Sequence, residues 1–315
     1  MVRALWAALP LLAASFLTSA AAAQTTHTGQ WPASVPFPEP IEPIGIRVVG
    51  GSPSLEEHVV GIAFEQNGEY RACSGLYISA YRILTAAHCT CNARNFRVSN
   101  QRQRDAFYIE ARFVAYFGNY DCQSRNYLPR GDDLALLEII QTLPVRGGSS
   151  SLKPLSEKKA CESFSLLPRM RVMARYFPDP PKNISVAGYG FNGLNSGERR
   201  EAVVSLDSAL CASDRAASLG CRSFAEFIAG NTPLSGTERD TCGGDSGGPA
   251  FFRVKGELVP VGIVSRALPI QQGFGTQYCG RGGIYTSINR YDVIGWLKYH
   301  GVPDTDRKCE TLPTE

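Results

Sequence analysis

Short apolar runs, separated by turn residues, follow one another along most of the chain after residue 47. Such runs are typical of β-strands, which are short and bounded by residues such as Gly, Pro, Asn and Ser. The expected strands are Val59–Phe64, Leu76–Ile78, Arg82–Ala86, Ala111–Tyr116, Leu134–Ile140, Ile184–Tyr189, Ala202–Leu206, Val259–Val264 and Gly283–Ile288. Since no helical segments alternate with them, the pattern predicts an all-β fold, either a sandwich or a pair of barrels.

One helix is expected near the end of the chain. Asn289 is a suitable N-cap residue. Val293, Ile294 and Leu297 share one face of the helix that follows, as a helix packed on a core requires. Gly301 is expected to end it, because glycine readily adopts the left-handed conformation found after helices.

The first residues have the features of a secretory signal peptide, which we place at residues 1–23. Arg3 supplies a positive start, Leu5–Leu17 is mostly apolar, and an A-x-A site ends at Ala23. Cleavage is therefore expected before Gln24. A membrane anchor is the alternative interpretation, but the apolar run is short for a membrane span. No later segment is long and apolar enough to cross a bilayer.

Three segments lie outside the expected main domain, residues 48–301, or interrupt it. Residues 24–47 contain five prolines and little amphipathic pattern, which indicates an extended linker or pro-segment. Residues 153–185 form a long connection rich in Arg and Pro, interpreted as a surface loop or, alternatively, a substrate-guiding exosite. Residues 302–315 are interpreted as a C-terminal tail.

Charge and cysteine content narrow the choice of partners and compartment. Lys and Arg total 32, Asp and Glu total 29, and the net charge of +3 gives no argument for a nucleic-acid partner. Ten cysteines, an even number without a C-x-x-C pair, fit an exported and oxidised protein. The four histidines do not cluster with cysteines at metal-ligand spacing, so no zinc site is expected.

The string T-C-G-G-D-S-G-G-P at residues 241–249 contains the strongest candidate nucleophile, Ser246. A serine hydroxyl is mostly protonated at neutral pH and needs a base beside it. Glycines on both sides let backbone N–H groups approach a substrate oxygen closely, as an oxyanion hole requires. The alternative is a glycine-rich turn with an inert serine, for which this string would have to arise by chance.

Two further segments supply a base and a carboxylate. His88, in L-T-A-A-H-C, follows an apolar run and is the natural general base near neutral pH. Asp133 directly precedes the run L-A-L-L, and a partly buried carboxylate needs a partner such as a histidine N–H. We prefer Asp133 to Asp132, for which a surface loop is the simpler interpretation.

The motifs T-A-A-H-C, D-L-A-L and G-D-S-G-G-P, in this order, resemble the chymotrypsin/trypsin family of serine proteases over roughly Val48–Gly301. The resemblance implies two six-stranded antiparallel β-barrels with the active site in the cleft between them. It also implies that Ser246 is the nucleophile, His88 the general base and acid, and Asp133 the orienting carboxylate. The N–H groups of Gly244 and Ser246 correspond to the oxyanion hole.

The string R-V-V-G-G at residues 47–51 resembles the family's activation site. Cleavage after Arg47 would free the ammonium group of Val48, which in the family pairs with the aspartate before the nucleophile, here Asp245. Asp245 is otherwise a costly buried charge that the incoming cation satisfies. The resemblance therefore implies a zymogen, whereas a plain strand start is the alternative.

The resemblance also implies a substrate pocket with Asp240 at its floor, where an aspartate favours Arg or Lys. Acceptance of Arg47 would then permit self-activation. Where the family often has S-W-G, this chain has Ser265, Arg266 and Ala267. The Ala267 methyl is expected to narrow the pocket and Arg266 to repel cationic substrate residues, while Gly283 keeps the opposite wall open.

The resemblance pairs some of the cysteines. It implies disulfides Cys73–Cys89 and Cys242–Cys279. Cys211 matches one partner of a third family disulfide whose usual mate is replaced near Ile228, so Cys211–Cys221 is a substitute hypothesis. Cys91–Cys122 and Cys161–Cys309 are plausible for the remaining cysteines, although sequence alone does not fix this connectivity.

The expected function is therefore that of a secreted serine endopeptidase, extracellular or periplasmic, that cleaves proteins or peptides after Arg or Lys without a cofactor. Protein inhibitors are possible partners. The rival from another class is a catalytically inactive binding protein, but all three catalytic candidates are present. A second rival is a protease specific for small or aromatic residues, suggested by Ala267.

Two surface features complete the expectations. The segment Arg94–Asp105 corresponds to a loop that binds calcium in some animal relatives. It has one acid and four arginines, so no calcium is expected, because oxygen ligands are mainly carboxylates. Asn183 begins the sequon N-I-S, a potential glycosylation site in a secreted protein.

Overall fold

The computed structural model describes residues 48, 51–79, 81–100, 109–123, 131–140, 182–190, 197–230, 240–254, 257–268 and 282–302. The expected signal peptide and pro-segment, residues 1–47, and the tail after residue 302 lie outside these ranges. The strands are β1 (Ser52–Pro53), β2 (Val59–Gln66), β3 (Glu69–Ser79), β4 (Arg82–Thr85), β5 (Ala93–Ser99), β6 (Ile109–Tyr116), β7 (Ala135–Ile139), β8 (Asn183–Gly188), β9 (Arg200–Ser208), β10 (Glu226–Ala229), β11 (Pro249–Val254), β12 (Glu257–Ala267) and β13 (Gly283–Ser287). The helical elements are the 3₁₀ turn η1 (Ala87–Cys89), α3 (Asp214–Ser218) and α4 (Tyr291–Tyr299).

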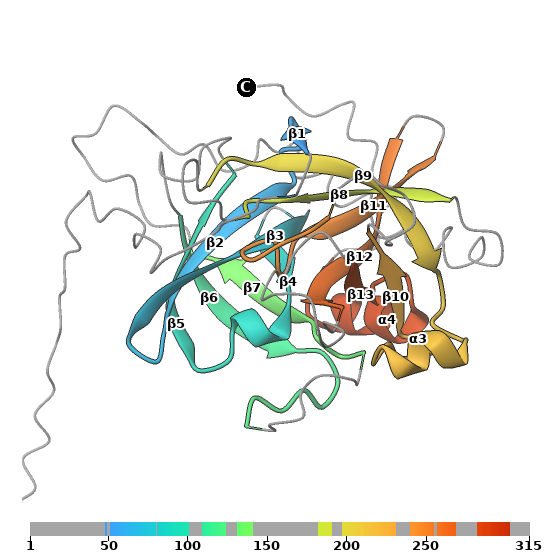
Figure 1. Cartoon of the computed structure of the whole chain (residues 1–315). Helices are drawn as coiled ribbons and strands as arrows, with labels where there is room; N and C mark the ends of the chain where they lie inside the picture. The colour runs from blue at the N-terminus through green and yellow to red at the C-terminus, as the bar shows by residue number, and fades with distance from the viewer. Residues whose placement is uncertain are drawn as a thin grey trace, which may run out of the picture. The chain divides into compact units, whose positions relative to one another are not determined.

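The first barrel is a closed antiparallel ring of strands in the order β2-β3-β4-β7-β6-β5, coloured blue to green in Figure 1. Strand β2 pairs with β3 on one edge and with β5 on the other, which closes the ring. Val59, Val60 and Ile62 of β2 are at most 1% exposed, so both faces of this strand are covered. Burial on both faces explains why the strand is continuously apolar at its start.

The second barrel contains β9-β10-β13-β12-β11-β8 in this order, and β8 pairs again with β9 to close it. The short strand β1 adds to β9 outside the ring. Every pairing in this barrel is antiparallel. The expected all-β architecture of two six-stranded antiparallel barrels with a C-terminal helix is confirmed.

Helix α4 follows the second barrel in sequence but packs on the core of the first. Val293, Ile294 and Leu297 are buried in that core, as the sequence pattern predicts. The N-cap prediction is wrong by one residue, because Arg290 occupies the cap and Asn289 is buried with its Oδ1 accepting from the Ser287 hydroxyl. No helix in the described ranges is both long and apolar enough to cross a membrane.

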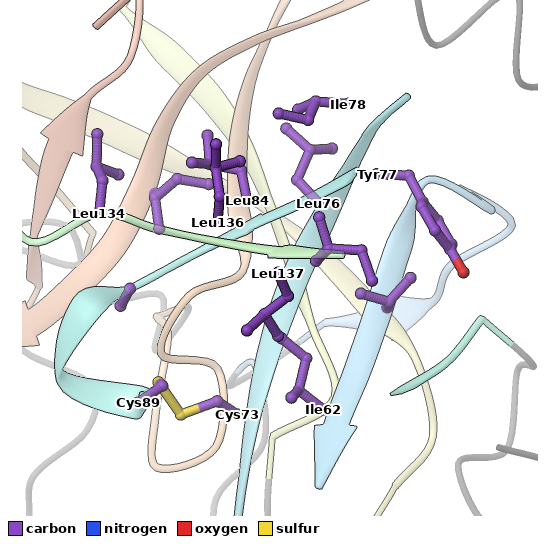
Figure 2. Close-up of a cluster of buried hydrophobic side chains, with 14 of the residues drawn as sticks. Ile62, Cys73, Leu76, Tyr77, Ile78, Leu84, Cys89, Leu134, Leu136 and Leu137 are labelled. Carbon is purple, nitrogen blue, oxygen red and sulfur yellow. A yellow bond between two sulfur atoms is a disulfide. The ribbon is translucent and has the colours of Figure 1, made fainter. Parts of the chain in front are cut away.

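Disulfides brace the loops around these barrels. Figure 2 shows Cys73–Cys89 beside the apolar cluster that includes Leu84 and Leu136. The bonded pairs are Cys73–Cys89, Cys91–Cys122 and Cys211–Cys221. Cys242 is also disulfide-bonded. The expected partner Cys279, and the expected pair Cys161–Cys309, lie outside the described residues.

Candidate active site

His88 and Asp133 meet at one end of the first barrel. Strand β4 ends at Thr85 and leads into the turn η1, which carries His88, while Asp133 lies just before β7, the strand paired with β4. His88 Nδ1 is 2.9 Å from Asp133 Oδ2, and the His88 backbone N–H donates to Asp133 Oδ1 over 2.9 Å. Two contacts therefore fix the carboxylate against the turn, and Nδ1 is positioned to donate to it.

The second barrel supplies a third contact to this carboxylate. Ser265, in β12, donates its hydroxyl to Asp133 Oδ2 over 2.7 Å. Burial alone would raise the pKa of Asp133, but the charge and hydrogen bonds of His88, with the Ser265 hydroxyl, lower it overall. For His88, burial has the opposite effect and lowers the pKa. The Asp133 carboxylate outweighs this effect and raises the pKa of His88 overall. The pair thus favours an ionised carboxylate beside an imidazole of increased basicity.

Ser246 is anchored beside the same turn by its main chain. Its carbonyl accepts the N–H of Ser74, in β3 of the first barrel, over 2.8 Å. The sulfur of Cys89 is 3.6 Å from His88 Nε2 and 3.9 Å from the Ser246 carbonyl oxygen. The imidazole and the serine main chain therefore flank one sulfur atom. No hydrogen bond joins Ser246 Oγ to His88 Nε2 among the described residues, and catalytic hydrogen bonds are often long before substrate binds.

Glycine is required directly after the serine. Gly247 has φ of +81°, and a Cβ there would lie 2.3 Å from the carbonyl oxygen of Ser74. Its N–H donates to the carbonyl of Val264 in β12 over 2.8 Å. A residue with a side chain would push the serine loop away from β3, so this glycine permits the two barrels to approach at the site.

The N–H groups expected to form an oxyanion hole belong to Gly244 and Ser246. Within the described part of the chain, neither donates a hydrogen bond to the protein. The Gly244 carbonyl accepts from the Ser74 hydroxyl over 2.9 Å, and that hydroxyl accepts the N–H of Tyr189 over 2.9 Å. The peptide groups of this loop are thus held in place while two donors remain available for a ligand oxygen.

Ser74 is one residue of this site that sequence reasoning missed. It is fully buried, and its backbone and hydroxyl hold the carbonyls of Ser246 and Gly244. A buried polar residue must be hydrogen-bonded, so a small hydroxyl between the cysteine and the apolar end of β3 was the available signal. That signal does not identify the hydrogen-bond partners of Ser74. Gly244, for example, lies 170 residues away in sequence.

Asp245 is completely buried and lacks a cation among the described residues. Its Oδ1 accepts the N–H of Gly190 over 2.8 Å and its Oδ2 the N–H of Cys242 over 2.9 Å. Burial is the largest influence on this carboxyl group and raises its pKa to about 7. Val48 is 1% exposed, and the expected cleavage residue Arg47 lies outside the described ranges.

Asp240 is also buried, at 1% exposure, near the start of β13. Its Oδ1 accepts the N–H of Thr241 over 2.7 Å and its Oδ2 the N–H of Gly282 over 2.8 Å. The expected wall residues Ala267 and Gly283 pair across β12 and β13, directly after Gly282, and Ala267 is exposed. The structure thus brings the expected floor and walls to the same end of these two strands.

Arg266 does not present a free charge to the site. Its guanidinium forms an ion pair with Glu226, with Nη1 and Oε1 2.7 Å apart. The Glu226 side chain is 0% exposed and that of Arg266 is 14% exposed. The expected repulsion of cationic substrate residues therefore loses its physical basis, because a buried anion compensates the charge.

A metal site is not available at the cysteine cluster beside His88. The donor atoms of Cys73, His88 and Cys89 lie within 4.8 Å of one another, but the two cysteines form a disulfide and are not thiolates.

The sequon residue Asn183 is exposed at the start of β8. The expected calcium-loop counterpart is described only up to residue 100.

Comparisons with known proteins agree with this arrangement. A family model described as Trypsin matches residues 48–294. The chain is similar to the CLIP domain-containing serine protease B4 of Anopheles gambiae, with 26% identity over 283 residues that cover 80% of this chain and 69% of that protein. A structural match to HL collagenase, solved at 1.7 Å resolution, has a TM-score of 0.53 at 16% identity and covers 82% of this chain and 100% of that one. At that identity the structural match concerns the fold.

Proposed function

This chain belongs to the trypsin family and is a serine-type endopeptidase, and we propose that it cleaves peptide bonds after Arg or Lys. The observation that supports the specificity is the buried carboxylate of Asp240, which accepts the N–H of Gly282 directly before the paired residues Ala267 and Gly283. A cationic side chain that enters a narrow pocket loses its hydration and needs a fixed anion. Asp240 supplies that anion, and its two backbone hydrogen bonds hold it in place.

The proposed catalytic roles follow from the contacts of His88. With Nδ1–H donated to Asp133, Nε2 is free to take the hydroxyl proton of Ser246 as Oγ attacks the substrate carbonyl carbon. The developing oxyanion then accepts from the N–H groups of Gly244 and Ser246. His88 returns the proton to the leaving amine, and water, activated in the same way, releases the acyl group from Ser246.

The pH dependence of activity should reflect the raised pKa of His88. Because the base must be neutral, kcat/KM is expected to fall as the pH drops through a value above the ordinary histidine pKa of 6.5. In Asp133→Asn the carboxylate that raises this pKa is lost, so the acid limb of the residual activity should move to lower pH. Initial rates between about pH 5 and 9 measure both limbs, and an unmoved limb in Asp133→Asn would contradict the assignment of the base.

We further propose that the enzyme is secreted as a zymogen, with a signal peptide at 1–23 and a pro-segment at 24–47. Disulfides in the described domain fit an oxidising compartment. Cleavage after Arg47 would create a cation at Val48. The buried Asp245, for which the described residues supply two N–H donors and no cation, is the proposed partner. Pairing of the two would complete the ordering of the nucleophile loop.

Asp245 should make the uncleaved protein less stable as the pH rises. An acid whose pKa is raised by folding favours the folded state below its unfolded pKa of 3.8, and this contribution is lost as the pH rises through the folded pKa of about 7. The loss is roughly 4 kcal/mol. In an Arg47→Gln background, which blocks processing, Asp245→Asn should match the parent near pH 4 and exceed it at pH 8. Urea unfolding measures the free energy of unfolding of both proteins at each pH. If it depended on pH in the same way in both proteins, the raised pKa of Asp245 would be refuted.

The specificity proposal is tested by cleavage of peptides that differ only in the residue before the scissile bond. The full chain is expressed, and the amino terminus of the active product is sequenced. A start at Val48 and a preference for Arg and Lys over neutral residues support the proposal. An active product with another amino terminus would overturn the zymogen assignment, and equal rates for all residues would overturn the specificity.

A further inference from the structure

The ion pair between Glu226 and Arg266 spans the sheet of the second barrel. Glu226 in β10 is opposite Thr286, and Arg266 in β12 is opposite Ile284, so the two lie diagonally across the intervening strand β13. Nη1 to Oε1 is 2.7 Å and Nη2 to Oε2 is 2.8 Å, a two-point contact that fixes the plane of the guanidinium. This pair is therefore a rigid element rather than a mobile surface pair.

Two backbone contacts join the pair to the loop closed by the Cys211–Cys221 disulfide. Arg266 Nη2 donates to the carbonyl of Gly220 over 2.6 Å, and Glu226 Oε2 accepts the N–H of Arg222 over 2.8 Å. Gly220 lies inside this loop and Arg222 directly follows it, so both ends of the pair contact the loop or its exit. These contacts hold the guanidinium in one orientation, whereas an unconstrained arginine side chain would sample several rotamers.

On its other side the guanidinium reaches the group that holds the proposed catalytic carboxylate. Arg266 Nη1 is 3.2 Å from Ser265 Oγ, which in turn donates to Asp133 Oδ2 over 2.7 Å. Neighbouring residues of a regular strand point to opposite faces. Here the register with β13 shifts between Val264 and Arg266, and such an irregularity re-aims side chains next to active sites. The shift brings both side chains to one hydroxyl.

We propose that Arg266, held by Glu226, is a positioning residue that orients the Ser265 hydroxyl and through it the Asp133–His88 pair. The proposal rests on the catalytic roles assigned above. A hydroxyl that accepts from a cation becomes a better donor to a carboxylate, and its donor direction is fixed. The Cys211–Cys221 loop is thereby connected to the catalytic base through contacts between named atoms.

The charges of this network give the proposal a signature that a purely structural role lacks. Among the described residues, the charged groups that act on the His88 ring are Asp133, which raises its pKa, and Arg266, which lowers it. Glu226 compensates the charge of Arg266. Arg266→Met should therefore move the acid limb of kcat/KM to higher pH, while Glu226→Gln, which leaves the cation uncompensated, should move it to lower pH.

The decisive experiment compares the pH profiles of wild type, both single variants and the double variant Glu226→Gln/Arg266→Met. The double variant lacks both charges, so its limb should lie between those of the two single variants. Arg266→Met is also expected to lower kcat by about tenfold or more with a smaller change in KM, because misorientation of the base affects the chemical step. Arg266→Lys keeps the positive charge but cannot make the two-point guanidinium contact. Its kcat should therefore fall, while the acid limb of kcat/KM stays at the pH of wild type.

Arg82→Met is the matched control, since Arg82 forms a strand-to-strand ion pair with Glu138 in the first barrel. It should leave both the limb and kcat near the values of wild type. The positioning role would be overturned if the acid limb of kcat/KM in Arg266→Met and Glu226→Gln coincided with that of wild type, or if both variants shifted it in the same direction. Ser246→Ala is measured as a separate test of the proposed function. If this variant kept its activity, the catalytic assignment itself would be refuted, whatever the Arg266 variants show.

Discussion

Replacing Ser246 with Ala is expected to reduce kcat/KM of the processed enzyme by about 10⁴–10⁶-fold. The substitution removes the hydroxyl that we propose as the nucleophile. The His88–Asp133 contact and the N–H groups of Gly244 and Ser246 remain, because none of them uses the Ser246 hydroxyl. A residual rate above that of water is therefore expected from binding and oxyanion stabilisation alone.

The measurement is steady-state hydrolysis of an arginyl peptide, together with a thermal unfolding curve for each protein. Ser218→Ala is the control, since Ser218 is an exposed serine at the end of α3 whose hydroxyl donates to the carbonyl of Arg215. Control activity should equal that of wild type. If Ser246→Ala retained more than a small fraction of the activity with an unchanged fold, another nucleophile would have to act.

Apolar residues dominate most of the strands that the sequence predicted, although β10 and β11, which are also largely apolar, were not predicted. Strand β7 at Ala135–Ile139 is an example of a predicted strand, and nearly every side chain in it is buried. Strand β5 at Ala93–Ser99 was not predicted, since Arg94 and Asn95 are exposed and interrupt the apolar pattern on one face. A barrel tolerates such a strand because ring closure supplies hydrogen bonds to both of its edges whatever its outward side chains are.

The site divides in a similar way. His88, Asp133 and Ser246 lie in short motifs that local sequence makes visible, so the sequence alone proposed all three. Ser74 and Glu226 were not found, because each acts through a contact with a partner remote in sequence and has no motif of its own. The Arg266 departure was noticed, but its ion-pair partner Glu226, which lies 40 residues away, was not. Contacts between distant strands are set by barrel topology, which sequence periodicity does not encode.

Removing the charge at the pocket floor with Asp240→Asn should lower kcat/KM for arginyl and lysyl substrates by about 10²–10⁴-fold. The amide has nearly the shape of the carboxylate, so the variant isolates the charge. A substrate cation would then lie desolvated in the pocket without an anion, and breaking a buried pair in this way costs about 3–5 kcal/mol. Neutral substrates lose no such interaction, so their rates should change much less.

The informative quantity is the ratio of kcat/KM for an arginyl peptide to that for a peptide with a neutral residue at the same position. Asp214→Asn is the control, because Asp214 is an exposed acid in the first turn of α3, and its loss should leave the ratio unchanged. A drop of equal size for all peptides in Asp240→Asn would indicate damage to the loop that Asp240 holds through Thr241 and Gly282. A collapse of the ratio with neutral substrates preserved would instead locate specificity in the charge itself, since only the cationic ligand depends on that charge for its desolvation.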